Sequence, residues 1–334
     1  MALHQIIYQR IMPQGPAAME ACRGFLLLLL FVGPMFLMLS IYQWDMSLEG
    51  REGVRQQELR KQQLRRQCDG DGFAEEKRSL EDINARHLEN LIVDDNYGVI
   101  YCYIPKVACT NWKRVFLVLN QSKPYPDPMS IPDENVHIDS KYTFLNRFPK
   151  FEIKAKLKHY TKFLYVRDPF VRLISAYRDK FQHQNEQFYQ NVGKHILRRY
   201  GHHSDPPKTV HEAFASGVHV SFYNFIQYLL EPRTGRPFDP HWRQMHRLCH
   251  PCLIQYDFIG HQETLQQDAE LLLKILRLED DIKFPPSYKN MTSLDSVSDW
   301  FDTVPLEDRR KLYELYEEDF RLFGYRKPDE LLDG

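Results

Sequence analysis

The sequence predicts an α/β domain in which a central parallel sheet is flanked by helices. Two observations support this prediction. Short runs of β-branched and aromatic residues alternate with segments whose apolar residues recur at helical spacing, which is typical of parallel sheets covered on both faces. Two of these runs are each followed by a tight turn and a helix start, at residues 99–119 and 162–177.

The first strand–turn–helix unit begins with a buried strand at 99–104. Pro105 ends this strand because it has no N–H to donate to a neighbour. A helix then starts at Thr110 or Asn111. The first turn of a helix leaves N–H groups unpaired, which suits an anion, and Lys106 adds a mobile positive charge. This is phosphate-binding architecture without the glycine-rich pattern of nucleoside triphosphatases.

The second unit carries a better marked helix start. Asp168 is a good N-cap, and Pro169 is a good first helical residue. Arg167 closes the preceding strand, while Arg172 and Ser175 are three residues apart and share a helix face. Two guanidinium groups and a hydroxyl near a helix start predict a receptor for a phosphate monoester.

Further elements continue the alternation of strands and helices after a lead-in at 87–93. We expect helices at 150–160, 214–230, 264–278 and 306–320, and a short buried strand at 256–260.

The two units resemble the 5′-phosphosulfate and 3′-phosphate motifs of sulfotransferases that use 3′-phosphoadenylyl sulfate (PAPS). The sequences of these motifs are most similar to those of the Golgi carbohydrate sulfotransferases of the chondroitin 4-O-sulfotransferase and HNK-1 group. Similar segments occur at 238–242, 248–252, 283–288 and 322–325, so that the resemblance covers roughly residues 85–332. It implies the P-loop-like sulfotransferase fold.

The resemblance also implies which residues contact the sulfate donor, without a metal. Arg167 and Ser175 are the stronger candidates of the second motif, whereas Arg172 is either a ligand or an outward-facing surface residue. The first motif comprises Pro105, Lys106, Val107, Ala108, Cys109, Thr110 and Asn111; the second comprises Arg167, Asp168, Pro169, Phe170, Val171, Arg172, Leu173, Ile174 and Ser175.

Sulfuryl transfer requires stabilisation of the leaving phosphate and removal of a proton from the acceptor hydroxyl. Lys106 suits the first task. His137 is our candidate base, because it lies between the two motifs and related enzymes place a catalytic histidine in this interval. The alternative for His137 is a structural role in its loop. His241, His183 and Glu263 are the next candidates for the base.

The N-terminal part predicts a membrane anchor, because residues 24–44 are apolar and uncharged over about one bilayer thickness. The resemblance and the sequons place the long C-terminal part in the Golgi lumen. We therefore expect a cytoplasmic tail at 1–23, a single-pass signal anchor at 24–44, a polar stem at 45–84 and the lumenal sulfotransferase domain at 85–334.

Asn120 and Asn290 each begin an N-glycosylation triplet. Cys22 borders the predicted membrane span, which leaves five cysteines in the lumenal part, so at least one is free or pairs between chains. Cys249 and Cys252 form a C-x-x-C pair that suggests a redox site, a zinc site or disulfides. No second C-x-x-C completes a zinc site, and we expect structural disulfides with open connectivity.

Charge is unevenly distributed along a chain whose formal net charge is −1. Residues 147–199 hold 13 Lys/Arg against 4 Asp/Glu, whereas residues 257–334 hold 10 against 19. A basic centre fits an anionic ligand, although ordinary solvated helix faces give the same pattern. The acidic last third argues against nucleic acid as a partner.

The leading hypothesis is a Golgi enzyme that transfers sulfate from PAPS to the 4-hydroxyl of N-acetylgalactosamine in chondroitin or desulfated dermatan. Sibling hypotheses keep the reaction and change the acceptor to dermatan, terminal N-acetylgalactosamine or the HNK-1 glucuronic acid. A kinase-like enzyme is disfavoured by the missing glycine-rich pattern. A non-catalytic membrane glycoprotein with this fold is disfavoured by the presence of Lys106, Arg167 and Ser175.

Overall fold

A computed structural model describes residues 50–70, 84–231, 238–287, 292 and 297–333. The chain divides into two compact units, Met1–Arg55 and Gln56–Gly334. The described part of the first unit is helical and holds an ion pair between Arg55 and Glu52. Among the described helices, none combines the length and apolar character needed to cross a bilayer. The predicted span 24–44 lies outside these residues.

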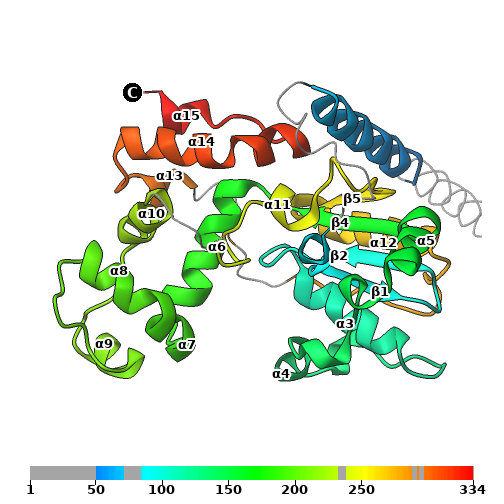
Figure 1. Cartoon of the computed structure of the whole chain (residues 1–334), viewed down its shortest axis with the longest axis horizontal. Coiled ribbons are helices and arrows are strands. Elements are labelled where there is room, and N and C mark those ends of the chain that lie inside the picture. Colours follow the sequence, from blue (N-terminus) through cyan, green and yellow to red (C-terminus); the bar gives the residue numbers. More distant parts are fainter. Residues whose placement is uncertain (1–49, 71–83, 232–237, 288–291, 293–296, 334) are drawn as a thin grey trace, which may run out of the picture. The chain divides into compact units, whose positions relative to one another are not determined.

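A five-stranded sheet forms the centre of the second unit (Figure 1). Strands β2, β4 and β5 are parallel to one another, whereas β1 is antiparallel to both β2 and β3. The strand order is β3-β1-β2-β4-β5, with β1 at Leu91–Asp94, β2 at Val99–Cys102, β3 at Thr143–Phe144, β4 at Thr161–Val166 and β5 at Phe258–His261.

The α/β prediction is confirmed, but the expectation of an entirely parallel sheet is wrong. Residues 95–98 join β1 to β2 in a tight turn, and Gly98 has a φ of +59°, which glycine adopts easily. A parallel pair needs a crossover of a dozen or more residues. The four-residue link therefore forces β1 to run antiparallel, and β3 then pairs on its outer edge.

The parallel register brings the two predicted motifs to one edge of the sheet. Cys102 of β2 is the register partner of Leu164 in β4, and Val166 of β4 is the partner of His261 in β5. The chain segments that leave the carboxyl ends of β2 and β4 are therefore neighbours. Ligands of open α/β sheets commonly bind outside this edge.

Aromatic packing fixes helix α3 (Cys109–Leu119) against the sheet. The ring centroid of Trp112 lies 4.8 Å from that of Phe163 and 4.9 Å from that of Phe284. Tyr101 stacks on Phe163 with ring centroids 4.7 Å apart. Pairs of this kind add about 0.5–1.5 kcal/mol beyond the apolar area they bury. The same core includes apolar residues of α5 (Lys150–His159) and α12 (Leu265–Ile275).

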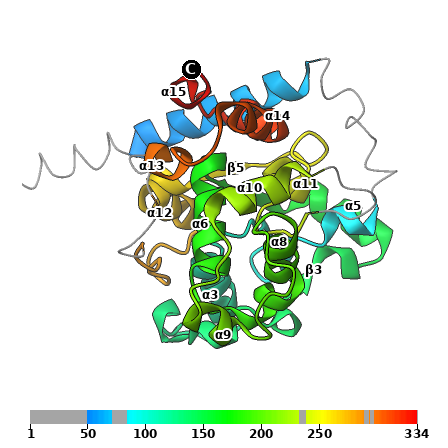
Figure 2. The same ribbon diagram turned by 90° about the vertical axis from the view of Figure 1, so that its left-hand side faces the viewer.

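A second hydrophobic cluster consists almost entirely of helices. Helix α14 packs against α6, α10 and α11, as Figures 1 and 2 show. The helices of this part are α6 (Pro169–Phe181), α7 (Glu186–Phe188), α8 (Lys194–Arg199), α9 (Val210–Ala215), α10 (Phe222–Leu230), α11 (Met245–Cys249), α13 (Val297–Phe301), α14 (Leu306–Phe323) and α15 (Asp329–Leu332).

The helix expected at 214–230 is wrong, because the structure divides it. Helix α9 ends at Ala215 and α10 begins at Phe222. Gly217 between them has a φ of +71°, which helical geometry does not allow. Ser221 then caps α10 by accepting a hydrogen bond from the backbone N–H of Asn224 at 3.0 Å. The other predicted helices and strands are present with ends shifted by a few residues.

A polar helix at 50–68 contributes its residues 56–68 to the second unit. The side-chain amide of Gln57 donates to the carbonyl of Ile259 at 3.0 Å and accepts from the Ile259 N–H at 2.9 Å. It therefore satisfies both backbone groups on the open edge of β5. Arg60 adds an ion pair with the buried Asp268 at 2.8 Å. Residues that we expected in the stem are thus part of the folded domain.

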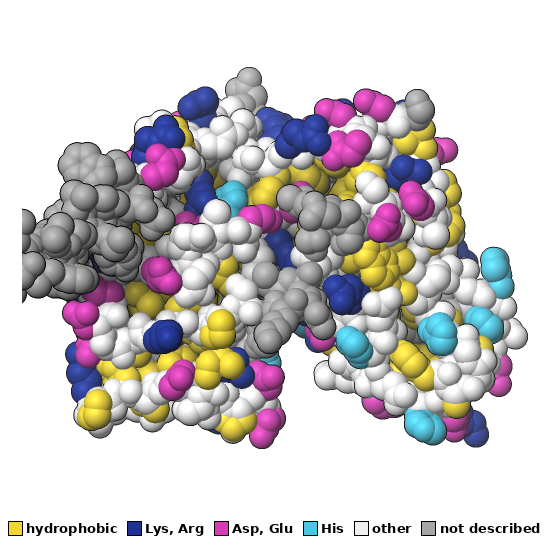
Figure 3. Space-filling model, turned by 180° about the vertical axis from the view of Figure 1, so that it is seen from behind, with side chains coloured by type: hydrophobic (Ala, Val, Ile, Leu, Met, Phe, Trp, Pro, Cys, Tyr) yellow, Lys and Arg dark blue, Asp and Glu magenta, His cyan; other side chains and the backbone are white. Residues whose placement is uncertain are grey.

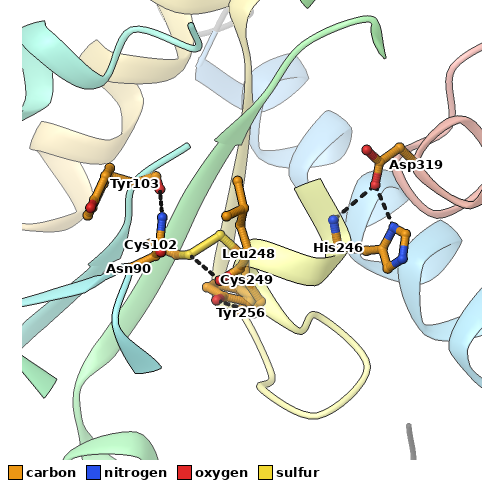
Figure 4. Close-up of a disulfide and its surroundings, with 8 residues drawn as sticks. All are labelled: Asn90, Cys102, Tyr103, His246, Leu248, Cys249, Tyr256 and Asp319. Carbon is orange, nitrogen blue, oxygen red and sulfur yellow. Dashed lines mark hydrogen bonds and ion pairs between the residues drawn. A yellow bond between two sulfur atoms is a disulfide. The ribbon is translucent and has the colours of Figure 1, made fainter. Parts of the chain in front are cut away.

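Two disulfides tie distant parts of this unit together. Cys102 of β2 pairs with Cys249 of α11 (Figure 4), and Cys68 of the polar helix pairs with Cys252. The expectation of structural disulfides at the C-x-x-C pair is confirmed, and among the cysteines that the structure describes Cys109 is the free one. Figure 4 also shows His246 of α11 directed at Asp319 of α14, with Nδ1 2.7 Å from Oδ1.

We predict that Cys249→Ser lowers the melting temperature by roughly 5–15 °C, because a disulfide that closes a long loop contributes about 2–5 kcal/mol. Thermal unfolding without reductant measures this change. Cys109→Ser is the matched control and leaves the melting temperature within about 2 °C. Equal melting temperatures for the two variants would contradict a structural role for the Cys102–Cys249 bond.

Candidate active site

Two buried arginines join the loop after β2 to the loop after β4. Arg167 donates from Nη1 to the carbonyl of Lys106 at 3.1 Å. Arg172 donates from Nε to the carbonyl of Pro105 at 3.0 Å. Both motifs named by the sequence therefore lie at one place.

The first loop turns sharply into α3. Lys106 has a φ of 71° and Ala108 a φ of 48°, so two residues with side chains occupy the left-handed region. Such residues cost of order 1–3 kcal/mol each and cluster at functional sites. Helix α3 begins at Cys109, one residue earlier than expected, and no side chain caps its start. Its first-turn amides are therefore suited to an anionic ligand.

The Lys106 ammonium is held by a carboxylate from α6. Its Nζ lies 3.1 Å from Oδ2 of Asp179, which also lies 3.0 Å from Nζ of Lys180. Burial pushes the pKa of Asp179 upward, but the two ammonium groups outweigh this effect and hold its pKa below the ordinary value. Asp179 is thus ionised and shared between two cations.

The predicted start of α6 is confirmed. Oδ1 of Asp168 accepts hydrogen bonds from the N–H groups of Phe170 at 2.9 Å and Val171 at 3.0 Å, and Pro169 occupies the first turn. Burial raises the pKa of Asp168 to about 6, although these two bonds oppose the rise. Because its carboxylate is committed to the cap, Asp168 positions the loop.

Arg167 and Arg178 converge on Thr292. Arg167 donates from Nη2 to the Thr292 carbonyl, and Arg178 donates from Nη1 to its hydroxyl at 2.9 Å. Burial lowers the pKa of Arg167 to about 10, which still leaves the guanidinium charged at neutral pH. Ser175, one turn before Arg178, is half-buried on the same helix. A phosphate-sized anion would find cationic and hydroxyl donors here.

The sequence left two roles open for Arg172, a ligand of the donor or an outward-facing surface residue, and its surroundings fit neither. Only 1% of its surface is exposed, and its remaining nitrogens donate to the carbonyls of Arg243 at 2.7 Å and Pro240 at 2.8 Å. Its guanidinium therefore serves backbone groups. Four neighbours in the second motif are likewise core residues, namely Phe170, Val171, Leu173 and Ile174.

Asn111 links the first motif to a segment near the C-terminal end. Its side-chain amide donates to the carbonyls of Pro285 at 3.3 Å and Pro286 at 3.4 Å. Asn111 is buried, as are Pro105 and Val107, whereas Lys106, Ala108, Cys109 and Thr110 are partly exposed. The accessible half of the motif is therefore its middle.

His137 follows α4 (Asp133–Val136) and lies beside the start of α3. Its Nε2 is 3.3 Å from the hydroxyl of Thr110. The side chain is open to solvent, yet partial desolvation, followed by the charges of Lys113 and Lys180, lowers the pKa of His137 below its ordinary value. At neutral pH the imidazole is therefore neutral and able to accept a proton.

His241 is a second histidine near the same lysines. Its Nδ1 lies 2.6 Å from Oδ1 of Asp239, an arrangement that leaves Nε2 as the free nitrogen. Burial lowers the pKa of His241, with Lys180 and Lys106 acting in the same direction and Asp239 opposing them. Asp239 thus orients the ring, and a base at His241 is chemically feasible.

The two remaining candidate bases differ in their surroundings. His183 is exposed after the end of α6. Glu263 accepts the N–H of Asp168 at 3.1 Å and the hydroxyl of Tyr325 at 3.0 Å, so both of its oxygens have structural partners. These contacts favour a histidine over Glu263 as the base.

Several residues of this site escaped the sequence analysis, namely Arg178, Asp179, Lys180, Asp239 and Thr292. A usable signal existed for Asp179, which follows Ser175 by four residues and therefore lies on the same face of α6. For Thr292 there was none, because its contacts to Arg167 and Arg178 span more than a hundred residues.

The surroundings of the site are rich in histidine. In Figure 3, exposed histidines gather over the part of the molecule that carries α7 to α9. Within the described ranges, no group of three or more His, Cys, Asp or Glu residues is arranged to hold a metal ion. Asn120 is exposed at the end of α3, whereas Asn290 lies outside the described residues.

An uncapped helix start beside a second cationic loop, on adjacent parallel strands, is suited to a phosphate-bearing ligand. The sulfotransferase family matches residues 89–326, and the chain belongs to this family as an enzyme of the sulfotransferase class.

Curated relatives confirm the resemblance to the carbohydrate sulfotransferases. Carbohydrate sulfotransferase 12 of Mus musculus is 52% identical over 309 residues, covering 87% of this chain and 74% of the relative. The Xenopus laevis protein of that name is 50% identical over 312 residues, with the same coverage. Carbohydrate sulfotransferase 11 of Rattus norvegicus is 38% identical over 278 residues, covering 82% and 77%. No solved structure matches the chain.

We predict that Arg172→Met destabilises the fold, because it leaves three buried carbonyls without their donor. The unfolding free energy should fall by about 3–5 kcal/mol, the scale for breaking a buried charged network. Denaturant unfolding measures this change. Arg198→Met, at an exposed arginine of α8, is the control and should shift stability by less than about 0.5 kcal/mol. A stable Arg172 variant with weakened nucleotide binding would instead make Arg172 a ligand.

Proposed function

We propose that this enzyme transfers sulfate from PAPS to the 4-hydroxyl of N-acetylgalactosamine in chondroitin, and in desulfated dermatan. The observation that carries the proposal is the joined pair of loops, with Arg167 bonded to the backbone of Lys106 at 3.1 Å. Relatives named carbohydrate sulfotransferase 12, about half identical to the chain, support a carbohydrate as the acceptor. The position of sulfation rests on the resemblance of the motifs to the chondroitin 4-O-sulfotransferase group.

The residues present fit the proposed donor. Lys106 and the first-turn amides of α3 would hold the 5′-phosphosulfate, because they combine a mobile charge with N–H groups left uncapped. Arg167 and Ser175 would hold the 3′-phosphate. Arg178, which lies on the same helix as Ser175, would add a third donor. PAPS supplies an activated sulfuryl group when it is bound, and the protein supplies position and charge.

Each reacting atom then has a residue to serve it. Lys106 stabilises the negative charge that grows on the 5′-phosphate when the bond from sulfur to the bridging oxygen breaks. His137 accepts the proton of the acceptor hydroxyl as the new sulfur–oxygen bond forms. The proton ends on the imidazole and the electron pair of the broken bond ends on the phosphate.

We place the enzyme in the Golgi membrane with its catalytic domain in the lumen. Three features support this location. Residues 24–44 are apolar and uncharged, Asn120 of the first sequon is exposed, and two disulfides suit an oxidising compartment. The acceptor is then a glycosaminoglycan chain made in the same compartment.

A panel of acceptors tests the proposed reaction. Labelled PAPS is offered with desulfated chondroitin, desulfated dermatan, a terminal N-acetylgalactosamine glycan and an HNK-1 precursor, and digested products are identified as disaccharides. We expect 4-O-sulfated N-acetylgalactosamine from chondroitin. Label entering only another glycan would overturn the chondroitin assignment.

Lys106→Ala should lower kcat about 10²-fold or more while changing the Kd of adenosine 3′,5′-bisphosphate much less.

The pH dependence tests His137. Its pKa is lowered from the ordinary histidine value, so the neutral base predominates at pH 6.5 and above, and kcat should fall as the pH drops through the lowered pKa. His137→Ala should reduce kcat about 10²- to 10⁴-fold, remove this acidic limb and leave the melting temperature unchanged. If the limb persists in this variant and vanishes in His241→Ala, the base is His241.

A further inference from the structure

We propose that Lys180 is a further substrate-binding residue, whose ammonium contacts the sulfuryl group of the donor during its transfer. This inference rests on the proposed function, because it assigns a ligand to the same site. Lys180 lies in the last turn of α6, the helix that begins with the second motif. Its side chain is only 14% exposed, which is unusual for a lysine at the end of a helix.

The charges around Lys180 leave room for an anion. Asp179 Oδ2 lies 3.0 Å from the Lys180 ammonium and 3.1 Å from the Lys106 ammonium. The two ammonium groups share this carboxylate, and the other acidic group nearby, Asp239, is hydrogen-bonded to His241. Because Lys106 belongs to the loop that would hold the 5′-phosphosulfate, Lys180 lies beside the proposed position of the sulfuryl group.

The ammonium of Lys180 lies over an aromatic ring. Its Nζ lies 4.7 Å from the centre of the Phe188 ring. The edge of that ring meets the imidazole of His241, with centroids 5.3 Å apart. Lys180 therefore lies between Lys106, on the donor side of the site, and His241.

The electrostatic effects of the Lys180 ammonium on its neighbours support the same placement. Lys180 is among the groups that act on the pKa values of His137, His241 and Asp239 as well as Asp179. In the described part of the chain, it thus lies near His137, His241, Asp179 and Asp239, where it would reach a sulfuryl group held between Lys106 and these histidines.

The chemistry gives Lys180 a task distinct from that of Lys106. In the transfer, the bond from sulfur to the bridging phosphate oxygen breaks and a bond to the acceptor oxygen forms. The three other oxygens of the sulfuryl group carry negative charge throughout. Lys106 serves the leaving oxygen, whereas Lys180 would hold these three oxygens, which exist in PAPS and are absent from adenosine 3′,5′-bisphosphate.

Binding of the two nucleotides provides the test. Calorimetry without acceptor measures the Kd of PAPS and of adenosine 3′,5′-bisphosphate for the wild type, Lys180→Met and Lys180→Arg. We expect Lys180→Met to weaken PAPS about 10- to 100-fold, the scale of a charge-assisted hydrogen bond, and to leave the bisphosphate within about twofold. Lys180→Arg should recover most of the PAPS affinity. A merely structural role would weaken both nucleotides together.

Controls separate this inference from the proposed function. Lys158→Met, at an exposed lysine of α5, should change neither Kd. Melting temperatures show whether each variant is folded, and if Lys180→Met is not, Lys180→Gln takes its place. Equal effects on both nucleotides, or no effect on PAPS, overturn the role of Lys180. A wild-type enzyme that binds neither nucleotide overturns the proposed function itself.

Discussion

The site depends on two buried guanidinium groups that satisfy backbone carbonyls of a neighbouring loop. Strand β2 ends at Cys102, and in the loop that follows the carbonyls of Pro105 and Lys106 need donors, which Arg172 and Arg167 provide. A buried arginine without acceptors would be as costly as the unpaired carbonyls. Each loop therefore stabilises the other. Since Lys106 has a left-handed backbone conformation within this contact, the position of its ammonium follows from the packing of α6.

Local signals in the sequence were enough for the frame of the site. Asp168 followed by Pro169 marks a helix start through chemistry that needs no distant partner, and the structure has that cap. Pro105 likewise marks the approximate end of β2 for a local reason, since the strand ends at Cys102. The adjacency of the two motifs then follows from parallel strands, which a crossover of sufficient length allows. The expectation of a parallel sheet failed at β1, because residues 95–98 are too few for the crossover that a parallel pair needs.

Hydrogen-bond partners distinguish residues that look alike in the sequence. Arg167 and Arg172 are both buried, yet Arg172 donates to three carbonyls, whereas Arg167 donates to two and lies beside Arg178 at Thr292. Composition was misleading for the polar helix at 50–68. Its polar residues predicted a stem, but the side chain of Gln57 bonds to the backbone of Ile259, 202 positions away. Such contacts depend on tertiary packing, which neither periodicity nor composition encodes.

The cations of the site have opposite effects on the donor and on the base. Lys180 favours an anionic donor but disfavours a protonated imidazole at His137 or His241, and burial adds to the second effect. In the proposed reaction the conflict eases, because charge accumulates on the leaving phosphate and offsets the lysines. Proton uptake by the proposed histidine base then becomes more favourable as the donor bond breaks, which couples deprotonation of the acceptor to transfer.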